Sequence, residues 1–266
     1  MKYLKRILGS FTFLAINSFS YYSSSKRTIM SAIVASTYKG VRGDGNNGDG
    51  IQILPQDNKY ENVVVFMHGL GDSCDGWASL MPELQLKNTK FILPTAKTRP
   101  ISINGGYSMP GWSDIYGLDM ESEEDRNGFN ESGQRIEKLI DAEIQKGINS
   151  NKIVIGGFSQ GGALALHVGL RYKHQLGGIV ALSTWLPLRK DYPAALSDVG
   201  KNVPIFQVHG SDDMVVAYQW GKSTNDLIKT FSITNPPQFL TIPGMGHSSD
   251  PDEIKALKEF LTSKLN

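Results

Sequence analysis

The sequence predicts an α/β fold with a mostly parallel, doubly wound sheet and helices on both faces. Two observations support this prediction. Beyond residue 50, short apolar runs typical of buried strands alternate with segments whose apolar residues recur at helical spacing. In addition, the stretch IVIGGFSQGGALALH at 153–167 passes from a strand pattern to a helix pattern across a glycine-rich turn. Such alternation is typical of parallel strands joined by crossover helices.

The predicted elements follow one another along the chain without an internal repeat. Buried strands are expected at 63–66, 90–93, 153–155, 178–182, 204–208 and 238–242. Helices are expected at 77–86, within 121–146, directly after the turn at 157–161, at 218–230 and at 252–265. Apolar residues lie on one face of the long helix (Ile136, Leu139, Ile140, Ile144) and of the last one (Ile254, Leu257, Phe260, Leu261). The pattern indicates one domain.

Composition narrows the functional classes. The chain has 266 residues, of which 40% are hydrophobic, and its net charge is +1, so it suits one large domain and carries no nucleic-acid footprint. Its single cysteine, Cys74, excludes an intramolecular disulfide and fits a reducing compartment. The five histidines lack a metal-ligand spacing. We therefore expect neither a metal nor a cofactor.

Residues 1–50 differ from the rest and are expected to be a leader followed by a linker. No acidic residue precedes Asp44, and apolar, tyrosine and serine residues are interspersed with the basic residues Lys2, Lys5, Arg6, Lys26 and Arg27. A mitochondrial presequence within 1–30 is favoured over a secretory signal, and the apolar run ILGSFTFLAI is too short and polar to span a membrane. Alternatively the leader is not used, and Met30 is the start. The stretch GVRGDGNNGDG at 40–50 indicates a flexible linker, which leaves 51–266 as the domain.

The turn Gly157-Phe158-Ser159-Gln160-Gly161 fits the pattern G-x-S-x-G. A strand that turns directly into a helix leaves its middle residue in strained geometry, and the flanking residues must be small where the chain passes close to itself. The serine hydroxyl then projects at the end of the strand, as in a nucleophile elbow. The alternative is a plain glycine-rich connection without a catalytic role. The catalytic interpretation requires the rest of the chain to supply a base and an acid.

Suitable partners for Ser159 follow other predicted strands. Ligands of doubly wound sheets lie beyond the carboxyl ends of the strands. The adjacent Asp212 and Asp213 follow the strand at 204–208, and His247 follows the strand at 238–242. The order serine, acid, histidine is that of α/β-hydrolases, which predicts this fold. Ser159 would be the nucleophile, His247 the base, and one of the two aspartates the orienting carboxylate. The residues alone leave the choice between the aspartates open.

An oxyanion hole needs two backbone N–H groups. We expect one from Gln160, at the start of the helix, and one from Leu70 in the turn HGLGD at 68–72. His68 would hold this turn by a hydrogen bond rather than act as a base. The remaining histidines are expected to be structural (His209), at the surface or in the core (His167), and solvated (His174).

Several longer motifs resemble the acyl-protein thioesterase family, also called the phospholipase/carboxylesterase family. They are FMHGLGDSCDGWA, PTAKTRPISINGGYSMPGWSDIYGL, GGFSQGGALAL, LSTWLP, HGSDDMVV and GMGHSS, in the family's order from about residue 62 onward. The resemblance implies a serine hydrolase of the cytosolic type that cleaves S-palmitoyl thioesters on proteins. It favours Asp213 as the acid, since the family's acid immediately precedes a Pro-Leu-Val-like turn. It also supports Leu70 and Gln160 as oxyanion donors.

The resemblance has two departures and leaves the substrate open. Ser113 follows Trp112 where the family commonly has phenylalanine, and Met214 replaces a common proline. Candidates for an acyl channel are Trp77, Met109, Trp112 and Leu118, and Leu70, Met81 and Ile115 are further residues that could line it. Expected partners are S-acylated proteins and, as further candidates, lysophospholipids, with transient contact to a membrane surface. The alternatives are a lysophospholipase or broad carboxylesterase acting on oxoesters, and a non-catalytic acyl-chain-binding protein, which the intact Ser159, Asp213 and His247 disfavour.

Overall fold

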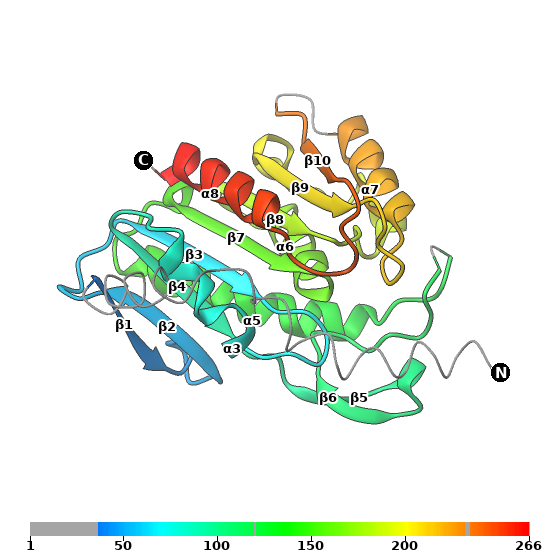
Figure 1. Ribbon diagram of the computed structural model, residues 1–266, viewed down its shortest axis with the longest axis horizontal. Coiled ribbons are helices and arrows are strands. Elements are labelled where there is room, and N and C mark those ends of the chain that lie inside the picture. Colours follow the sequence, from blue (N-terminus) through cyan, green and yellow to red (C-terminus); the bar gives the residue numbers. More distant parts are fainter. Residues whose placement is uncertain (1–36, 120, 232–234, 266) are drawn as a thin grey trace.

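The structure, a computed structural model, describes residues 37–119, 121–231 and 235–265. Within them, an eight-stranded sheet has the strand order β1-β2-β4-β3-β7-β8-β9-β10 (Figure 1). Its strands are β1 (Tyr38–Arg42), β2 (Gly50–Pro55), β3 (Asn62–Met67), β4 (Thr89–Pro94), β7 (Ile153–Phe158), β8 (Gly178–Leu182), β9 (Ile205–Gly210) and β10 (Gln238–Ile242). From β4 to β10 neighbouring strands are parallel, whereas β1 and β2 are antiparallel to their neighbours. The predicted mostly parallel sheet is confirmed.

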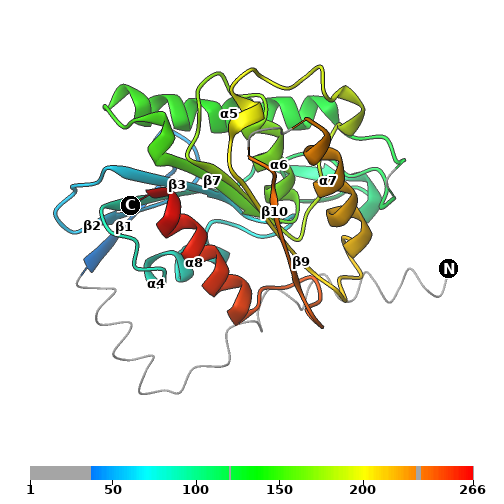
Figure 2. The ribbon, with the colours of Figure 1, turned by 90° about the horizontal axis from the view of Figure 1, so that it is seen from above.

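Helices cover both faces of this sheet (Figure 2). They are α3 (Asp75–Ala78), α4 (Leu80–Glu83), α5 (Arg126–Gln145), α6 (Gln160–Gly169), α7 (Tyr218–Phe231) and α8 (Pro251–Leu265). Short 3-10 turns occupy Ser102–Asn104, Ser150–Lys152, Arg189–Asp191 and Gly200–Asn202. Figure 2 shows α5, α6 and α7 on one side of the sheet and α4 and α8 on the other.

The central strand β3 shows how the sequence builds the two cores. Successive side chains of a strand point to opposite faces. Val63, Val65 and Met67 pack into the core that includes residues of α5 and α6. Val64 and Phe66 pack into the core that includes residues of α3, α4 and α8. Because both faces are covered, the strand reads as a continuous apolar run rather than as an alternating one.

The long helix α5 lies within the expected range 121–146 and begins at Arg126, where the Asp125 side chain accepts a hydrogen bond from Gly128 N. Two local features differ from the sequence predictions. The helix expected at 77–86 is two short helices, since Pro82 lacks the N–H that would continue a single one. The strands β5 (Thr98–Ile101) and β6 (Tyr107–Pro110) form a separate antiparallel pair that the sequence did not predict.

The glycine-rich stretch 40–50 joins two paired strands and is not the flexible linker expected from composition. Strands β1 and β2 pair along their length, and Asp44 in the turn between them is buried. Its Oδ1 accepts from Asn46 N and Gly48 N, and its Oδ2 accepts from Arg135 Nη2 at 2.8 Å. Gly50 has a φ of 155°, and a Cβ there would lie 2.5 Å from Leu93 O. The glycines therefore serve turns and close contacts. The expected leader at 1–30 lies outside the described residues.

A chain that starts at Ile51 would lose β1 and Asp44, so we expect it to melt at a lower temperature than the full chain. The contribution of the turn can be measured with one substitution. Asp44→Ala leaves two backbone N–H groups without their acceptor and removes the carboxylate that pairs with Arg135, at a cost of about 2–3 kcal/mol. For a domain of this size that lowers the melting temperature by about 4–10 °C.

Asp57→Ala is the matched control for calorimetry. Asp57 also lies in a turn and its Oδ1 accepts from Lys59 N, but it is exposed. We expect a shift below about 2 °C, as for most surface substitutions. Equal shifts in the two variants would contradict an anchoring role for Asp44.

Candidate active site

Loops at the carboxyl ends of neighbouring parallel strands converge at one edge of the sheet. The turn 68–72 follows β3, Ser159 follows β7, Asp213 lies beyond β9, and His247 lies beyond β10. Because β3 pairs with β7, and β8, β9 and β10 follow in order, these loops lie side by side. The site is thus where the sequence prediction put it, beyond the carboxyl ends of the strands.

Ser159 adopts the strained backbone expected of an elbow. Its φ is 54° and its ψ is −122°, a combination that L-residues rarely adopt. A Cβ on Gly157 would lie 2.4 Å from Gly161 C, and one on Gly161 would lie 2.2 Å from Met67 O. The small flanking residues are therefore required by close backbone contact. Thr184 Oγ1 donates to Ser159 O at 2.6 Å and helps to hold this conformation.

His247 lies between Ser159 and Asp213. Its Nε2 is 2.9 Å from Ser159 Oγ, and its Nδ1 is 2.8 Å from Asp213 Oδ2. The side chain of Asp213 is completely buried, that of His247 is 13% exposed, and the ring of Phe158 packs beside the imidazole. Such an arrangement can take a proton from the serine while the carboxylate fixes the opposite ring nitrogen as the N–H donor.

The structure distinguishes the two adjacent aspartates. Asp213 Oδ1 accepts from Val215 N and Val216 N, each at 2.9 Å, so the turn after it orients the carboxylate toward His247. Asp212 is exposed, and its Oδ1 accepts from Ser211 Oγ. The geometry agrees with the choice that the family resemblance favoured, although the residues alone had left it open.

The other buried histidines brace the site without facing the serine. His68 Nδ1 lies 2.6 Å from Gly69 O, and its Nε2 accepts from Ala96 N, so it holds the turn after β3 as expected. His209 Nε2 donates to Val216 O at 2.8 Å. Burial lowers the pKa of both imidazoles, which keeps them neutral hydrogen-bonding groups. Burial also lowers the pKa of His167 to about 3 in the core, whereas His174 is exposed.

The turn after β3 lies against the elbow. A Cβ on Gly69 would be 3.5 Å from the Cβ of Ser159, so the backbone of this turn passes close to the hydroxyl. Gly71 N donates to Pro110 O and ties the turn to β6. Gln160 is the first residue of α6, where N–H groups lack a carbonyl within the helix. Leu70 lies in this turn and Gln160 directly follows Ser159, and these are the positions from which we expect the two oxyanion donors.

The side chain of Gln160 joins the elbow to the segment around Trp112. Its Oε1 accepts from Trp112 N, and its Nε2 donates to Ser113 O and Ser113 Oγ. Trp112 Nε1 in turn donates to His68 O at 2.8 Å. These bonds fix the turn after β3, the elbow and residues 112–113 relative to one another.

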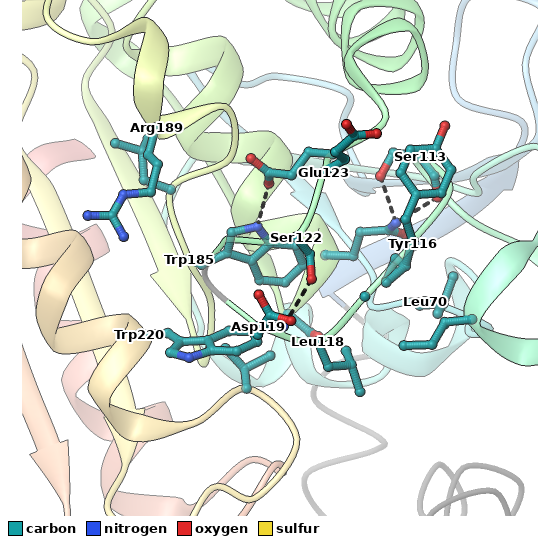
Figure 3. A pocket seen from close by; sticks show the side chains of 18 of the residues that line it. Leu70, Ser113, Tyr116, Leu118, Asp119, Ser122, Glu123, Trp185, Arg189 and Trp220 are labelled. Carbon is teal, nitrogen blue, oxygen red and sulfur yellow. Dashed lines mark hydrogen bonds between the residues drawn. The ribbon is translucent and has the colours of Figure 1, made fainter. Parts of the chain in front are cut away.

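A cavity of about 370 Å³ opens beside Ser159 (Figure 3). Its apolar walls come from the 103–118 segment, α5, the 185–186 segment and α7 with the turn before it; they include Leu70, Ile103, Ile115, Leu118, Phe129, Trp185, Leu186, Val215, Val216, Trp220 and Leu227. Polar and charged residues also line it (Asn104, Ser113, Asp114, Asp119, Ser122, Glu123, Glu124, Arg189, Ser223, Thr224). The cavity has the shape and chemistry to hold an apolar chain next to the serine.

Of the four acyl-channel candidates, Leu118 lines this cavity and the others do not. Trp77 packs against Phe66 and Phe158 in the core on the α8 side of the sheet. Trp112 is buried with its indole N–H bonded to His68 O, so it belongs to the framework of the site. Met109, on β6, also lies outside the cavity lining. The two tryptophans pack in the interior of the protein, and their positions within the motifs could not show this.

The sequence reasoning missed the wall formed by α7 and by Trp185. Trp220, Ser223, Thr224 and Leu227 line the cavity and recur at helical spacing on one face of α7. This spacing could be recognised in the sequence, although the apolar face of an amphipathic helix most often packs into the core. Trp185 lay within the motif LSTWLP, but nothing in the sequence indicates which way its ring points.

Two other kinds of site are absent from the described residues. Across 37–119, 121–231 and 235–265, no group of three or more histidine, cysteine, aspartate or glutamate side chains could hold a metal ion. The helices in that part of the chain are too short or too polar to cross a membrane. Cys74 is buried and free.

Comparison with known proteins agrees with the geometry. The family model for phospholipase/carboxylesterase matches residues 49–265. Acyl-protein thioesterase 1 of Neurospora crassa is 42% identical over 224 residues, covering 80% of this chain and 91% of that protein. Acyl-protein thioesterase 1 homolog 1 of Dictyostelium discoideum is 40% identical, covering 77% and 92%.

A solved structure extends the match to three dimensions. The crystal structure of Zea mays acyl-protein thioesterase 2 superposes with a TM-score of 0.73 at 28% identity, covering 86% of this chain and 99% of that one. Family model, relatives and fold agree, and the chain belongs to the phospholipase/carboxylesterase family of α/β-hydrolases.

Proposed function

We propose that this protein is a serine hydrolase that cleaves long-chain S-acyl thioesters on proteins, with Ser159, His247 and Asp213 as its catalytic residues. One observation carries the proposal: His247 is hydrogen-bonded to both Ser159 and Asp213 beside a largely apolar cavity. The names of the relatives, acyl-protein thioesterases, support the thioester as the substrate class.

In the acylation step, Ser159 Oγ attacks the carbonyl carbon of the acyl group while its proton passes to His247 Nε2. Asp213 stabilises the imidazolium and keeps its Nδ1–H directed at the carboxylate. The tetrahedral intermediate then collapses, the carbon–sulfur bond breaks, and the imidazolium gives its proton to the leaving thiolate. The products are an acyl-serine ester and the free cysteine thiol of the protein substrate.

Deacylation repeats these proton transfers with water. His247 takes a proton from the attacking water, whose oxygen bonds to the acyl carbon. The second tetrahedral intermediate then collapses, the bond from the acyl carbon to Ser159 Oγ breaks, the imidazolium returns its proton to Oγ, and the fatty acid leaves. The N–H groups of Leu70 and Gln160 would bind the oxyanion of both intermediates. Removal of one such donor typically lowers kcat by about 10²–10³-fold. The hydrogen bonds of the Gln160 side chain hold the residue that would carry one of these donors, so they would also affect the rate.

A lysophospholipase or broad carboxylesterase remains the second candidate, because the matched family is described as phospholipase/carboxylesterase. The same three residues would serve both reactions. A competition assay separates them: a palmitoyl-thioester peptide competes against lysophosphatidylcholine and p-nitrophenyl esters. Preference for an oxoester at equal chain length would contradict the thioesterase proposal.

The proposal extends to the partners and the location of the enzyme. S-acylated proteins would be its substrates, with lysophospholipids as a further class, and it would contact membrane surfaces transiently to reach them. The exposed Tyr116 and Leu118, which line the cavity, support such contact. We expect the catalytic domain to act in the cytoplasm and residues 1–30 to direct any mitochondrial import. Imaging of the full chain and of a chain starting at Met30 tests both expectations.

Ser159→Ala should lower kcat by about 10⁴–10⁶-fold, since the three residues act as a unit. Alanine lacks only the hydroxyl group of serine and leaves the packing of the elbow intact, so the melting temperature should stay within about 2 °C of that of the wild type. Activity within tenfold of the wild type would refute the assignment.

The two aspartates should respond differently to the same substitution. Asp213→Asn should lower kcat by about 10³–10⁴-fold, because an amide no longer fixes the correct tautomer of His247. Asp212→Asn is the matched control and should stay within threefold, as its side chain is exposed. Steady-state hydrolysis of p-nitrophenyl butyrate measures both, and the reverse ranking would show that the wrong carboxylate was chosen.

Activity should rise with acyl chain length. Lengthening a thioester from four to eight carbons adds four methylenes, which contribute up to roughly 3 kcal/mol if fully buried. Partial burial gives an expected rise in kcat/KM of about 10- to 100-fold. A flat profile would point to a small-ester carboxylesterase.

Leu118→Trp should reduce this chain-length dependence, because Leu118 lines the cavity. Met109→Trp is the matched control, since Met109 lies outside the lining, and it should leave the profile unchanged. If both variants flatten the profile equally, the acyl chain does not lie in this cavity.

A further inference from the structure

Two segments distant in sequence form facing walls of the cavity. Residues 113–119 and 122–124 supply one wall, and Trp185, Leu186 and Arg189 supply part of another. In Figure 3, Trp185 and Trp220 lie on one side of the cavity, and Leu70 and Tyr116 on the other. The separation of these walls decides which acyl chains fit, so the contacts between the two segments bear on specificity.

Glu124 joins the two segments through both of its carboxylate oxygens. Trp185 Nε1 donates to its Oε1 at 3.0 Å, and Leu188 N donates to its Oε2 at 2.6 Å. The bond at the indole of Trp185 is drawn in Figure 3. The backbone of Glu124 also forms an isolated antiparallel bridge with Ile115, another cavity residue. One side chain therefore connects the 115–124 loop to the tryptophan that faces it.

The conformation of the second segment depends on these bonds. Leu188 has a φ of 52°, in the left-handed region that a leucine enters only when surrounding contacts hold it there. The Glu124 carboxylate accepts the N–H of this residue, and it also accepts the single N–H of the indole at Trp185. With two hydrogen bonds fixing its loop and its ring, Trp185 has a defined position in the cavity wall.

The hydrogen-bond donors around Glu124 favour a carboxylate in this place, whereas burial opposes it. Burial raises the pKa of Glu124, and the bonds from Trp185 and Leu188, together with the nearby charge of Arg189, oppose that rise. Asp191 acts in the same direction as burial. Because both partners are N–H donors, the ionised form satisfies both of them, whereas a protonated carboxyl has an O–H directed at a donor.

We propose that Glu124 is a positioning residue that sets the acyl-chain specificity of the enzyme by fixing Trp185 in the wall of the cavity. The inference rests on the proposed function, since it assumes that the acyl chain occupies this cavity. Glu124 itself does not touch the reacting atoms. Its effect should therefore appear in the binding of long chains rather than in the chemical step at Ser159.

The test is a comparison of kcat/KM for four-carbon and long-chain acyl thioesters in the wild type and five variants. Glu124→Ala removes both acceptors, and Trp185→Phe removes the indole donor while keeping an aromatic ring. We expect each to lower the long-to-short ratio by about 5- to 30-fold, mainly through a higher KM for the long substrate, because a wall contact stabilises ground state and transition state alike. The double variant should lower the ratio no more than the stronger single variant, since both act through one interaction.

Glu121→Ala is the matched control. Glu121 pairs with Lys190 and so joins the same two segments, but both side chains are more than three-quarters exposed. Surface pairs contribute little, so the ratio should stay within twofold of the wild-type ratio.

Glu124→Gln keeps the size of the side chain and one acceptor oxygen, so we expect an intermediate ratio. This variant serves as the test if Glu124→Ala does not fold.

The outcomes separate the inference from the function on which it rests. A wild-type profile without chain-length dependence overturns both. A wild-type profile that rises, with variants at Glu124 that keep the same ratio or lose activity equally on both substrates, overturns the inference alone. Additive effects in the double variant also overturn it, since Glu124 would then act independently of Trp185.

Discussion

The hydrogen bonds from His247 to Ser159 and Asp213 are the interaction on which the rest of the site depends. Each partner comes from a different loop, and these loops come together only because β7, β8, β9 and β10 are parallel neighbours in one sheet. A parallel sheet needs crossover helices on both faces, which explains the continuous apolar strands and the two cores. The parallel order of these strands therefore brings three side chains that are distant in sequence within hydrogen-bonding distance.

The backbone strain of the site is concentrated at Ser159, between two glycines in close backbone contact. The elbow requires a positive φ at a serine and close contact at Gly157 and Gly161, and the neighbouring groups compensate for it. Thr184 holds the carbonyl of Ser159, and the Gln160 side chain ties the elbow to residues 112–113. The same framework places the turn after β3 over the serine. Rigidity of this kind would keep the proposed oxyanion donors in place without reorganisation during the reaction.

Much of this architecture could be predicted from local patterns. The strands and the order of Ser159, Asp213 and His247 were readable because buried strands and glycine-rich turns leave strong local signals. The hairpin of β1 and β2 was not, because glycines that serve a tight turn have the same composition as a linker. Its anchor, the contact of Asp44 with Arg135, joins residues far apart in sequence. Trp77 and Trp112 were misassigned for a related reason: a tryptophan in a core and one in a cavity wall look alike until the packing is known.

The proposed role of Ser159 as the nucleophile is tested most directly by covalent labelling. The protein is treated with a fluorophosphonate, which reacts with serines activated by a neighbouring base, and the adduct is located by intact-mass measurement and peptide mapping. We expect one adduct per chain, on the peptide that contains Ser159, and slower labelling when a long-chain acyl thioester is present. An unlabelled protein, or an adduct on another residue with Ser159 unmodified, would contradict this role.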